Sequence, residues 1–202
     1  MVFSSYVFWC FFAIVISLYY VLPHRWQNRM LLVASYIFYG WWDYRFVALM
    51  FATTLVDFYV AQRIDDSETQ KTRKRWLMVS IVMNLGLLAT LKYFNFFIEN
   101  AQGLLHTMGF EISPWTLQVI LPVGISFYTF EEMSYCIDVY RRELKASRNF
   151  VDFAVFIAFF PHLVAGPILR PSKLLSQFQH PRVWKTDYFA EGLYLVLTGL
   201  FK

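Results

Sequence analysis

Residues 1–24 read MVFSSYVFWCFFAIVISLYYVLPH, and no residue in this stretch carries a charge at neutral pH. At about 1.5 Å per residue, a helix of this length crosses a hydrocarbon core about 30 Å thick. A cleaved signal peptide would have a basic segment before the apolar one and small residues at a cleavage site. Neither feature is present, so the stretch predicts a retained transmembrane helix.

The composition of the whole chain agrees with a membrane protein and argues against a soluble one. Apolar residues make up 58% of the 202 residues and charged residues 16%, against roughly 25% charged in ordinary globular proteins. The 22 Phe, 13 Tyr and 7 Trp present more aromatic surface than a core of this size can bury. The net charge of +4 comes from short loops between apolar runs, which is unlike a nucleic-acid-binding surface.

The two cysteines, Cys10 and Cys136, both lie inside apolar runs, where a thiol behaves as a small hydrophobic group. We therefore predict no disulfide and no metal site. No glycine-rich phosphate loop is present either, and no bound cofactor is predicted.

Further apolar runs predict the remaining membrane segments. They cover Met30–Trp42, Phe46–Ala61, Leu77–Ile98, Val119–Tyr140, Phe150–Leu169 and Tyr188–Phe201. The predicted fold is an all-α, polytopic integral membrane bundle, with residues 1–202 forming part of one transmembrane domain. Because the last run is short for a span, we expect the protein to continue beyond Lys202.

Lys and Arg are distributed unevenly among the loops. They concentrate in Arg25–Arg29, Gln62–Arg75 and Arg141–Arg148, whereas Glu99–Gln118 contains none. Since basic loops stay on the cytoplasmic side of a membrane, this pattern predicts a periplasmic N-terminus.

Phe150–Leu169 conflicts with this topology if it crosses the membrane completely. A full crossing would place the basic residues of Arg170–Asp187 outside. A re-entrant segment that breaks at Pro161–Pro167 and returns to the cytoplasm removes the conflict. Because irregular backbone at membrane depth must be buried in protein or line a polar cavity, we predict a cavity beside it.

The stretch LPVGISFYTFEEMSYCIDVYR (121–141) places polar residues at helical spacing on an apolar helix. These residues are Tyr128, Glu131, Tyr135 and Asp138. One interpretation is a wall of a substrate tunnel, because ionisable groups inside a membrane usually face a cavity or the bundle interior. The other is a structural network, because buried polar groups must be paired whatever their role. The sequence leaves both open.

Other charged residues within apolar runs have simpler interpretations. Asp57 and Asp152 are lone acids for which we expect ion pairs, and Lys92 is expected to extend toward the headgroups. The Lys71–Arg75 cluster is explained by membrane topology, although an acidic carrier protein or anionic lipid could also bind it.

Several motifs together resemble the membrane-bound O-acyltransferases. They are MVFSS at the start, VASYIFYGWW (33–42), KYFNFF (92–97), LPVGISFYTF (121–130), SYCIDVYR (134–141) and FFPHLVAGPILR (159–170). The most similar branch includes the membrane subunits of alginate O-acetylation and of teichoic-acid D-alanylation. Glu132 departs from the pattern of the family, which has a small or uncharged residue there.

The resemblance implies transfer of an acyl group from a thioester donor (acyl-CoA or acyl-carrier protein) to hydroxyl groups of an exopolysaccharide or cell-wall polymer. It also implies a bacterial inner membrane and a periplasmic acetyltransferase partner. The family's catalytic histidine belongs to a WRRWH-type motif, which is absent from residues 1–202. We therefore expect no catalytic residue in this stretch and no acyl transfer by it alone.

His162, in PHLVAGP, lies within the predicted re-entrant segment. It could line the acyl path beside the polar stripe of residues 128–138, or it could bond to carbonyls that Pro161 and Pro167 leave free. Two further functions stay open on sequence grounds. One is a transporter or channel component, which would have similar polar stripes and broken helices, and the other is a non-functional truncated product.

Overall fold

The computed structural model describes residues 3, 5–107, 124–163, 166, 170–182 and 186–201. Within these ranges every regular element is a helix, as predicted. The elements are α1 (Tyr6–Val21), α2 (His24–Gly40), α3 (Tyr44–Asp66), α4 (Gln70–Leu88), the π-helix η1 (Ala89–Tyr93), α5 (Phe94–Thr107), α6 (Ile125–Tyr140), α7 (Phe150–Ala158), α8 (Phe160–Leu163), α9 (Pro171–Gln179) and α10 (Thr186–Phe201).

Short polar side chains set the beginnings of several helices. Ser5, Asp43 and Thr69 each accept a hydrogen bond from a backbone amide in the first turn of α1, α3 and α4. Such N-caps satisfy amides that have no partner within the helix. α1 stops at Val21 because Pro23 follows, and a proline disfavours helical backbone at the preceding residue.

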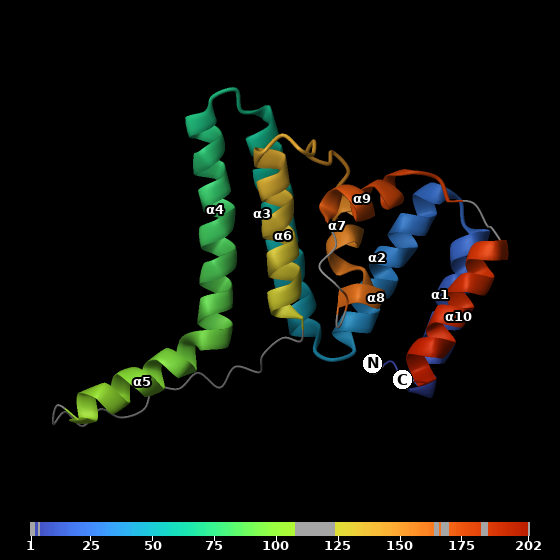
Figure 1. Cartoon of the computed structure of the whole chain (residues 1–202), viewed down its shortest axis with the longest axis horizontal. Coiled ribbons are helices and arrows are strands. Elements are labelled where there is room, and N and C mark those ends of the chain that lie inside the picture. The colour runs from blue at the N-terminus through green and yellow to red at the C-terminus, as the bar shows by residue number, and fades with distance from the viewer. Residues whose placement is uncertain are drawn as a thin grey trace.

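Two helices in the described part of the chain are long and apolar enough to cross a membrane. They are Tyr44–Asp66 and the continuous helix Gln70–Tyr93. α1 and Phe150–Leu163 are apolar but shorter. The predicted span Leu77–Ile98 is therefore placed differently, because the helix begins at Gln70 and turns at η1, after which α5 points away (Figure 1).

The helices form two packed groups. The first group is α3, α4 and α6, which lie side by side, and the second is α1, α2, α7, α8 and α9 (Figure 1). α7 packs against α3 and so joins the two groups. Large apolar side chains such as Val33, Val82 and Leu195 remain exposed on the outside. An outer surface of this kind suits lipid rather than water, and the protein is a membrane protein.

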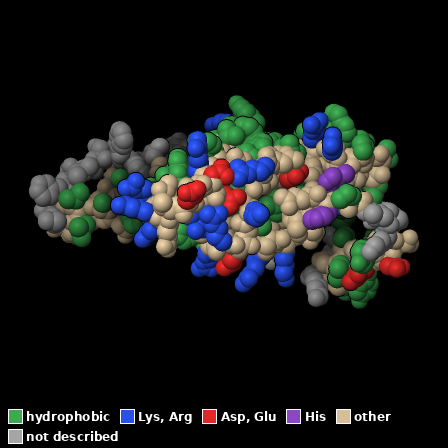
Figure 2. Space-filling model, turned by 90° about the horizontal axis from the view of Figure 1, so that it is seen from above, with side chains coloured by type: hydrophobic (Ala, Val, Ile, Leu, Met, Phe, Trp, Pro, Cys, Tyr) green, Lys and Arg blue, Asp and Glu red, His purple; other side chains and the backbone are tan. Residues whose placement is uncertain are grey.

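The basic loops lie at one end of the bundle. The α3–α4 turn, residues 141–149, the start of α2 and α9 all occur at the upper end in Figure 1. Figure 2 shows Lys and Arg side chains gathered across this face. The structure therefore places the predicted cytoplasmic loops together, while α5 lies at the other end.

Candidate functional site

Residues of the motifs LPVGISFYTF (121–130) and FFPHLVAGPILR (159–170) meet where α6 begins. Gly124 precedes α6 with φ of +78°, a backbone conformation that favours glycine. A Cβ atom at this position would lie 2.7 Å from the carbonyl oxygen of Leu163. Glycine is thus required for α6 to approach α8 so closely.

A buried acid–histidine pair connects the same two segments. His162 Nε2 lies 3.3 Å from Oε2 of Glu131, and the two residues are 6% and 0% exposed. The imidazole also packs against the rings of Phe127 and Phe159, with centroids 5.3 and 5.6 Å away. Among the described residues, the Glu131 carboxyl group is the hydrogen-bonding partner of this ring.

The backbone beyond His162 is held close to it. The amide of Gly166 donates to the carbonyl oxygen of His162 over 2.8 Å. A Cβ atom at Gly166 would lie 2.3 Å from the Cβ atom of His162, so only glycine fits at position 166. In the described residues, His162 Nδ1 and Glu131 Oε1 are buried without a hydrogen-bond partner. The pair therefore retains a donor or acceptor site for another group.

A second polar network lies between α3, α4 and α6. Asp57 accepts a hydrogen bond from the amide of Asn84 over 2.5 Å and one from the thiol of Cys136 over 3.6 Å. Glu132 accepts from the hydroxyls of Thr54 and Thr53 over 2.8 and 3.2 Å. All six residues are almost completely buried.

This network corrects one expectation and adds residues that the sequence interpretation missed. Among the described residues, Asp57 is bonded by the Asn84 amide and the Cys136 thiol rather than by a Lys or Arg side chain. Asp152 likewise accepts from the Asn28 amide over 2.6 Å. The sequence signal for Asn84 was its isolation within an apolar helix, but nothing in the pattern identified its partner.

The predicted stripe on α6 divides into separate environments. Tyr128 is buried beside Tyr39, and Glu131 contacts His162. The hydroxyl of Tyr135 accepts from the Ser147 amide over 2.7 Å, and Asp138 is partly exposed near the end of α6. None of these side chains lines a pocket described below, so their role as cavity-lining residues stays a prediction.

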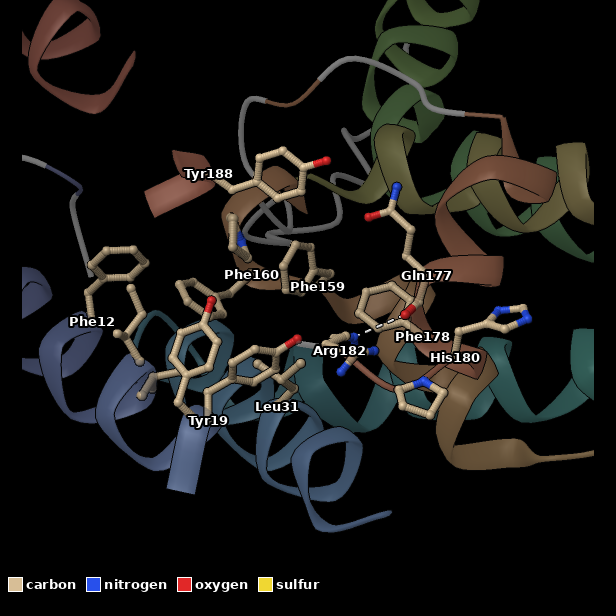
Figure 3. A pocket seen from close by; sticks show the side chains of 15 residues that line it. Phe12, Tyr19, Leu31, Phe159, Phe160, Gln177, Phe178, His180, Arg182 and Tyr188 are labelled. Atoms are coloured by element: carbon tan, nitrogen blue, oxygen red, sulfur yellow. Dashed lines mark hydrogen bonds between the residues drawn. The ribbon is translucent and has the colours of Figure 1, made fainter. Parts of the chain in front are cut away.

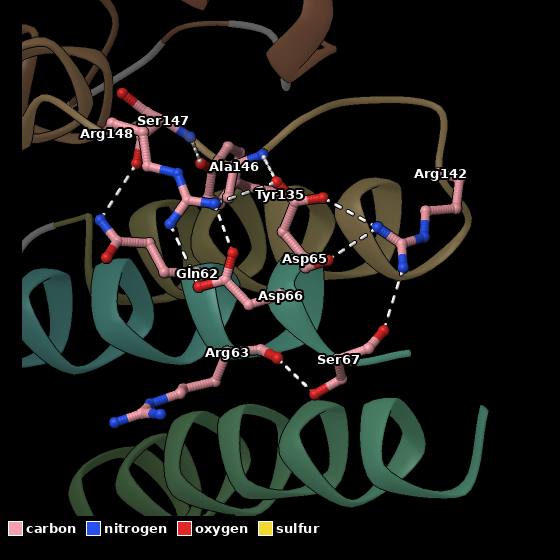
Figure 4. A network of polar contacts seen from close by, with 10 residues as sticks. All are labelled: Gln62, Arg63, Asp65, Asp66, Ser67, Tyr135, Arg142, Ala146, Ser147 and Arg148. Carbon is pink, nitrogen blue, oxygen red and sulfur yellow. Dashed lines mark hydrogen bonds and ion pairs between the residues drawn. The ribbon is translucent and has the colours of Figure 1, made fainter. Parts of the chain in front are cut away.

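The loop after α6 is clamped onto the end of α3 (Figure 4). Arg142 donates to Asp65 over 2.9 Å, and Arg148 donates to Asp66 over 2.5 Å. The hydrogen bond that Arg148 donates to the Asp66 carboxylate raises the pKa of the Arg148 guanidinium. This clamp explains the position of Tyr135, because it fixes Ser147 above the buried hydroxyl.

Asn28 connects the start of the predicted re-entrant segment, Phe150–Leu169, to α9, which follows that segment in the sequence. Its amide nitrogen donates to Asp152 at the start of α7 and, over 2.8 Å, to the carbonyl oxygen of Phe178 in the last turn of α9. α7 and α9 also pack against each other. The start of α7 and the last turn of α9 therefore lie close together, and a re-entrant path between them stays a prediction.

An aromatic pocket of about 750 Å³ lies beside this segment (Figure 3). It is lined by rings including Phe12, Tyr19, Phe159 and Phe160. Arg182 lies at its edge, where its guanidinium donates to the Gln177 carbonyl over 3.0 Å and packs over the Tyr19 ring at 5.5 Å. The pocket suits an apolar group near a positive charge. Sequence reasoning missed it because it combines residues from five helices.

Comparisons with known proteins give relatives along the whole chain. It is 43% identical over 205 residues to the "Probable alginate O-acetylase AlgI" of Azotobacter vinelandii, covering 100% of this chain and 40% of that protein. The corresponding protein of Pseudomonas aeruginosa is 42% identical, with 100% and 39% covered. A "Peptidoglycan O-acetyltransferase" of Helicobacter pylori is 30% identical over 198 residues, covering 85% of this chain and 37% of that protein.

The chain thus spans about 40% of the length of the curated relatives it matches. No family model matches the sequence, and no solved structure matches it.

Proposed function

Because the chain belongs to the membrane-bound O-acyltransferase family, we propose that the protein transfers acetyl or a similar acyl group to hydroxyls of an exopolysaccharide or cell-wall polymer. The observation that carries this proposal is the 43% identity to an alginate O-acetylase across all of this chain. The H. pylori relative, named for peptidoglycan, supports a polysaccharide acceptor as the common feature.

The proposed reaction exchanges a thioester for an ester. The acceptor oxygen bonds to the acyl carbon, the carbon–sulfur bond breaks, and the hydroxyl proton passes through a base to the leaving thiolate. The donor is an acyl thioester of coenzyme A or of a carrier protein. The base is the histidine of a WRRWH-type motif, which residues 1–202 do not contain. A histidine can take and return a proton near neutral pH.

Glu131 and His162 act as positioning residues in this proposal. Their contact, together with the close approaches at Gly124 and Gly166, holds residues 159–163 and Gly166 against α6. A fixed scaffold matters because a misplacement of about 1 Å can cost a catalyst about 100-fold in rate. The unpartnered atoms of the pair offer a polar contact to a group that enters the bundle.

The proposed location is the bacterial inner membrane, with the N-terminus in the periplasm. The basic face in Figure 2 then meets the cytoplasm, where thioester donors are made. The acyl group reaches the polymer on the other side, directly or through a periplasmic acetyltransferase partner.

Deletion of the gene that encodes this chain tests the proposal. The ester-linked acetate of the exopolysaccharide and of the cell-wall polymers should be measured after mild alkaline release. We expect one polymer to lose its acetate and to regain it when the gene is returned, but not when the returned copy has a stop codon at Trp9. Unchanged acetylation of all these polymers would contradict an acyl-transfer function.

A further inference from the structure

A polar pocket of about 420 Å³ lies between the first turns of α2 and α7. It is lined by His24, Arg25, Asn28, Arg29, Asn149, Val151 and Asp152. Both helices begin at the basic face, so the pocket opens where the membrane meets water in the topology described above. It is separated from the aromatic pocket by Asn28, whose side-chain oxygen accepts from Arg182 over 2.9 Å.

The two arginines of this pocket, Arg25 and Arg29, do not hold other described parts of the protein together through ion pairs. Arg25 and Arg29 are exposed, and neither forms an ion pair with an acid in the described residues. Arg29 packs over the ring of Trp26 at 4.9 Å, which leaves its guanidinium edge available. The Nδ1 atom of His24 is buried and has no hydrogen-bond partner there.

Asp152 is the acid among the seven lining residues, and its position is set by the fold. It accepts from Asn28 over 2.6 Å, and Asn28 is in turn fully bonded to Phe178 and Arg182. The pocket thus contains two arginines and one carboxyl group, and that carboxyl group already accepts a hydrogen bond. In addition, no side chain caps the first turn of α2, because Pro23 occupies the cap position.

We propose that this pocket binds a phosphate ester. Arginine pairs recognise phosphate oxygens through charge-assisted, often bidentate hydrogen bonds. An uncapped helix start adds favourable partial positive charge. A volume of about 420 Å³ admits the phosphate together with part of the molecule that carries it. That molecule is either a phospholipid, with the phosphate in its headgroup, or a soluble phosphate ester such as coenzyme A. Binding of a phospholipid is independent of acyl transfer, whereas binding of coenzyme A rests on the proposed function.

The test is ligand binding by the purified full-length protein in detergent. The melting temperature is followed by tryptophan fluorescence during titration with coenzyme A or with phosphatidylglycerol. A mixture of pantetheine and adenosine is the phosphate-free control for coenzyme A, and diacylglycerol is the control for phosphatidylglycerol. We expect one phosphate ester to raise the melting temperature saturably and its phosphate-free control to have no such effect. Coenzyme A as the active ligand identifies a soluble source, and phosphatidylglycerol identifies a lipid.

Three variants locate the binding. Arg25→Gln with Arg29→Gln should weaken the apparent affinity by about tenfold or more, because two charge-assisted contacts are lost. Lys74→Gln with Arg75→Gln removes the same charge from exposed positions on the same face and should have little effect. Val151→Phe fills the pocket without changing its charge, and we expect this variant to lose binding.

The proposal is overturned if no phosphate ester gives a saturable shift. It is also overturned if both double variants weaken binding equally, which indicates general attraction to a basic face, or if Val151→Phe binds normally. Intact folding of the Arg25/Arg29 variant is checked by its melting temperature without ligand.

Discussion

Gly124 is the residue on which the meeting of the two motifs depends most directly. We expect Gly124→Ala to destabilise the protein by about 1–3 kcal/mol, since alanine is strained at a positive φ and its Cβ would meet the Leu163 carbonyl at 2.7 Å. Gly86→Ala is the matched control, because nothing lies within 4 Å of that position and alanine favours a helix interior. Thermal unfolding in detergent should lower the midpoint for the first variant and keep or raise it for the second.

Glu132 provides a second test at the scale of single residues. Glu132→Gln keeps an oxygen acceptor for Thr53 and Thr54 and nearly the same volume, so we expect little change in stability. Glu132→Ala leaves a cavity and removes that acceptor, at a cost of about 2–4 kcal/mol. The stability of both variants is measured as the fraction of protein that stays monodisperse after heating. Glu143→Ala, at an exposed position, is the control. Equal behaviour of the Gln and Ala variants would show that the network does not stabilise the bundle.

At the scale of elements, residue type and periodicity predicted much of the fold. Apolar runs located the helices, and the basic loop at 170–187 indicated a returning segment that the Asn28 contacts now support. Helix ends were less accurate, because caps such as Thr69 extend α4 into a polar stretch.

Side-chain partners were the part that sequence could not supply. Asn28 and Asp152 are 124 positions apart, and Glu131 and His162 are 31 apart. Helical spacing places a residue on a face of its own helix but does not say which helix packs there. Helical spacing therefore predicted one polar surface for residues 128–138 of α6. In the structure these residues contact three different neighbours, which are Tyr39, His162 and Ser147.

The return of the segment between α7 and α9 can be measured directly. Single cysteines at Asn149 and His180, both exposed, should react with a membrane-impermeant thiol reagent from the same side of the membrane. The background replaces Cys10, which is exposed, and keeps Cys136, which is buried. Labelling of the two positions from opposite sides would mean that Phe150–Gln179 crosses completely.

At the scale of the whole molecule, the gathered basic loops define the orientation. We expect reporter fusions after Ser67 to report the cytoplasm and fusions after Gln102 to report the periplasm, because α5 lies at the opposite end from the α3–α4 turn (Figure 1). The reverse result at Ser67 would invert the topology and place the phosphate-ester pocket outside the cell.

We propose that two motifs far apart in the sequence form one working unit through the contact between Glu131 and His162. The most direct measurement is a double-mutant cycle on acyl transfer to polymer, using the full-length protein with Glu131→Gln, His162→Gln and both changes together, at matched membrane levels. We expect each single change to lower the rate and the double change to lower it no further than the more damaging single one, a coupling of about 0.5–3 kcal/mol. Full activity of both single variants, or losses that simply multiply in the double variant, would contradict it.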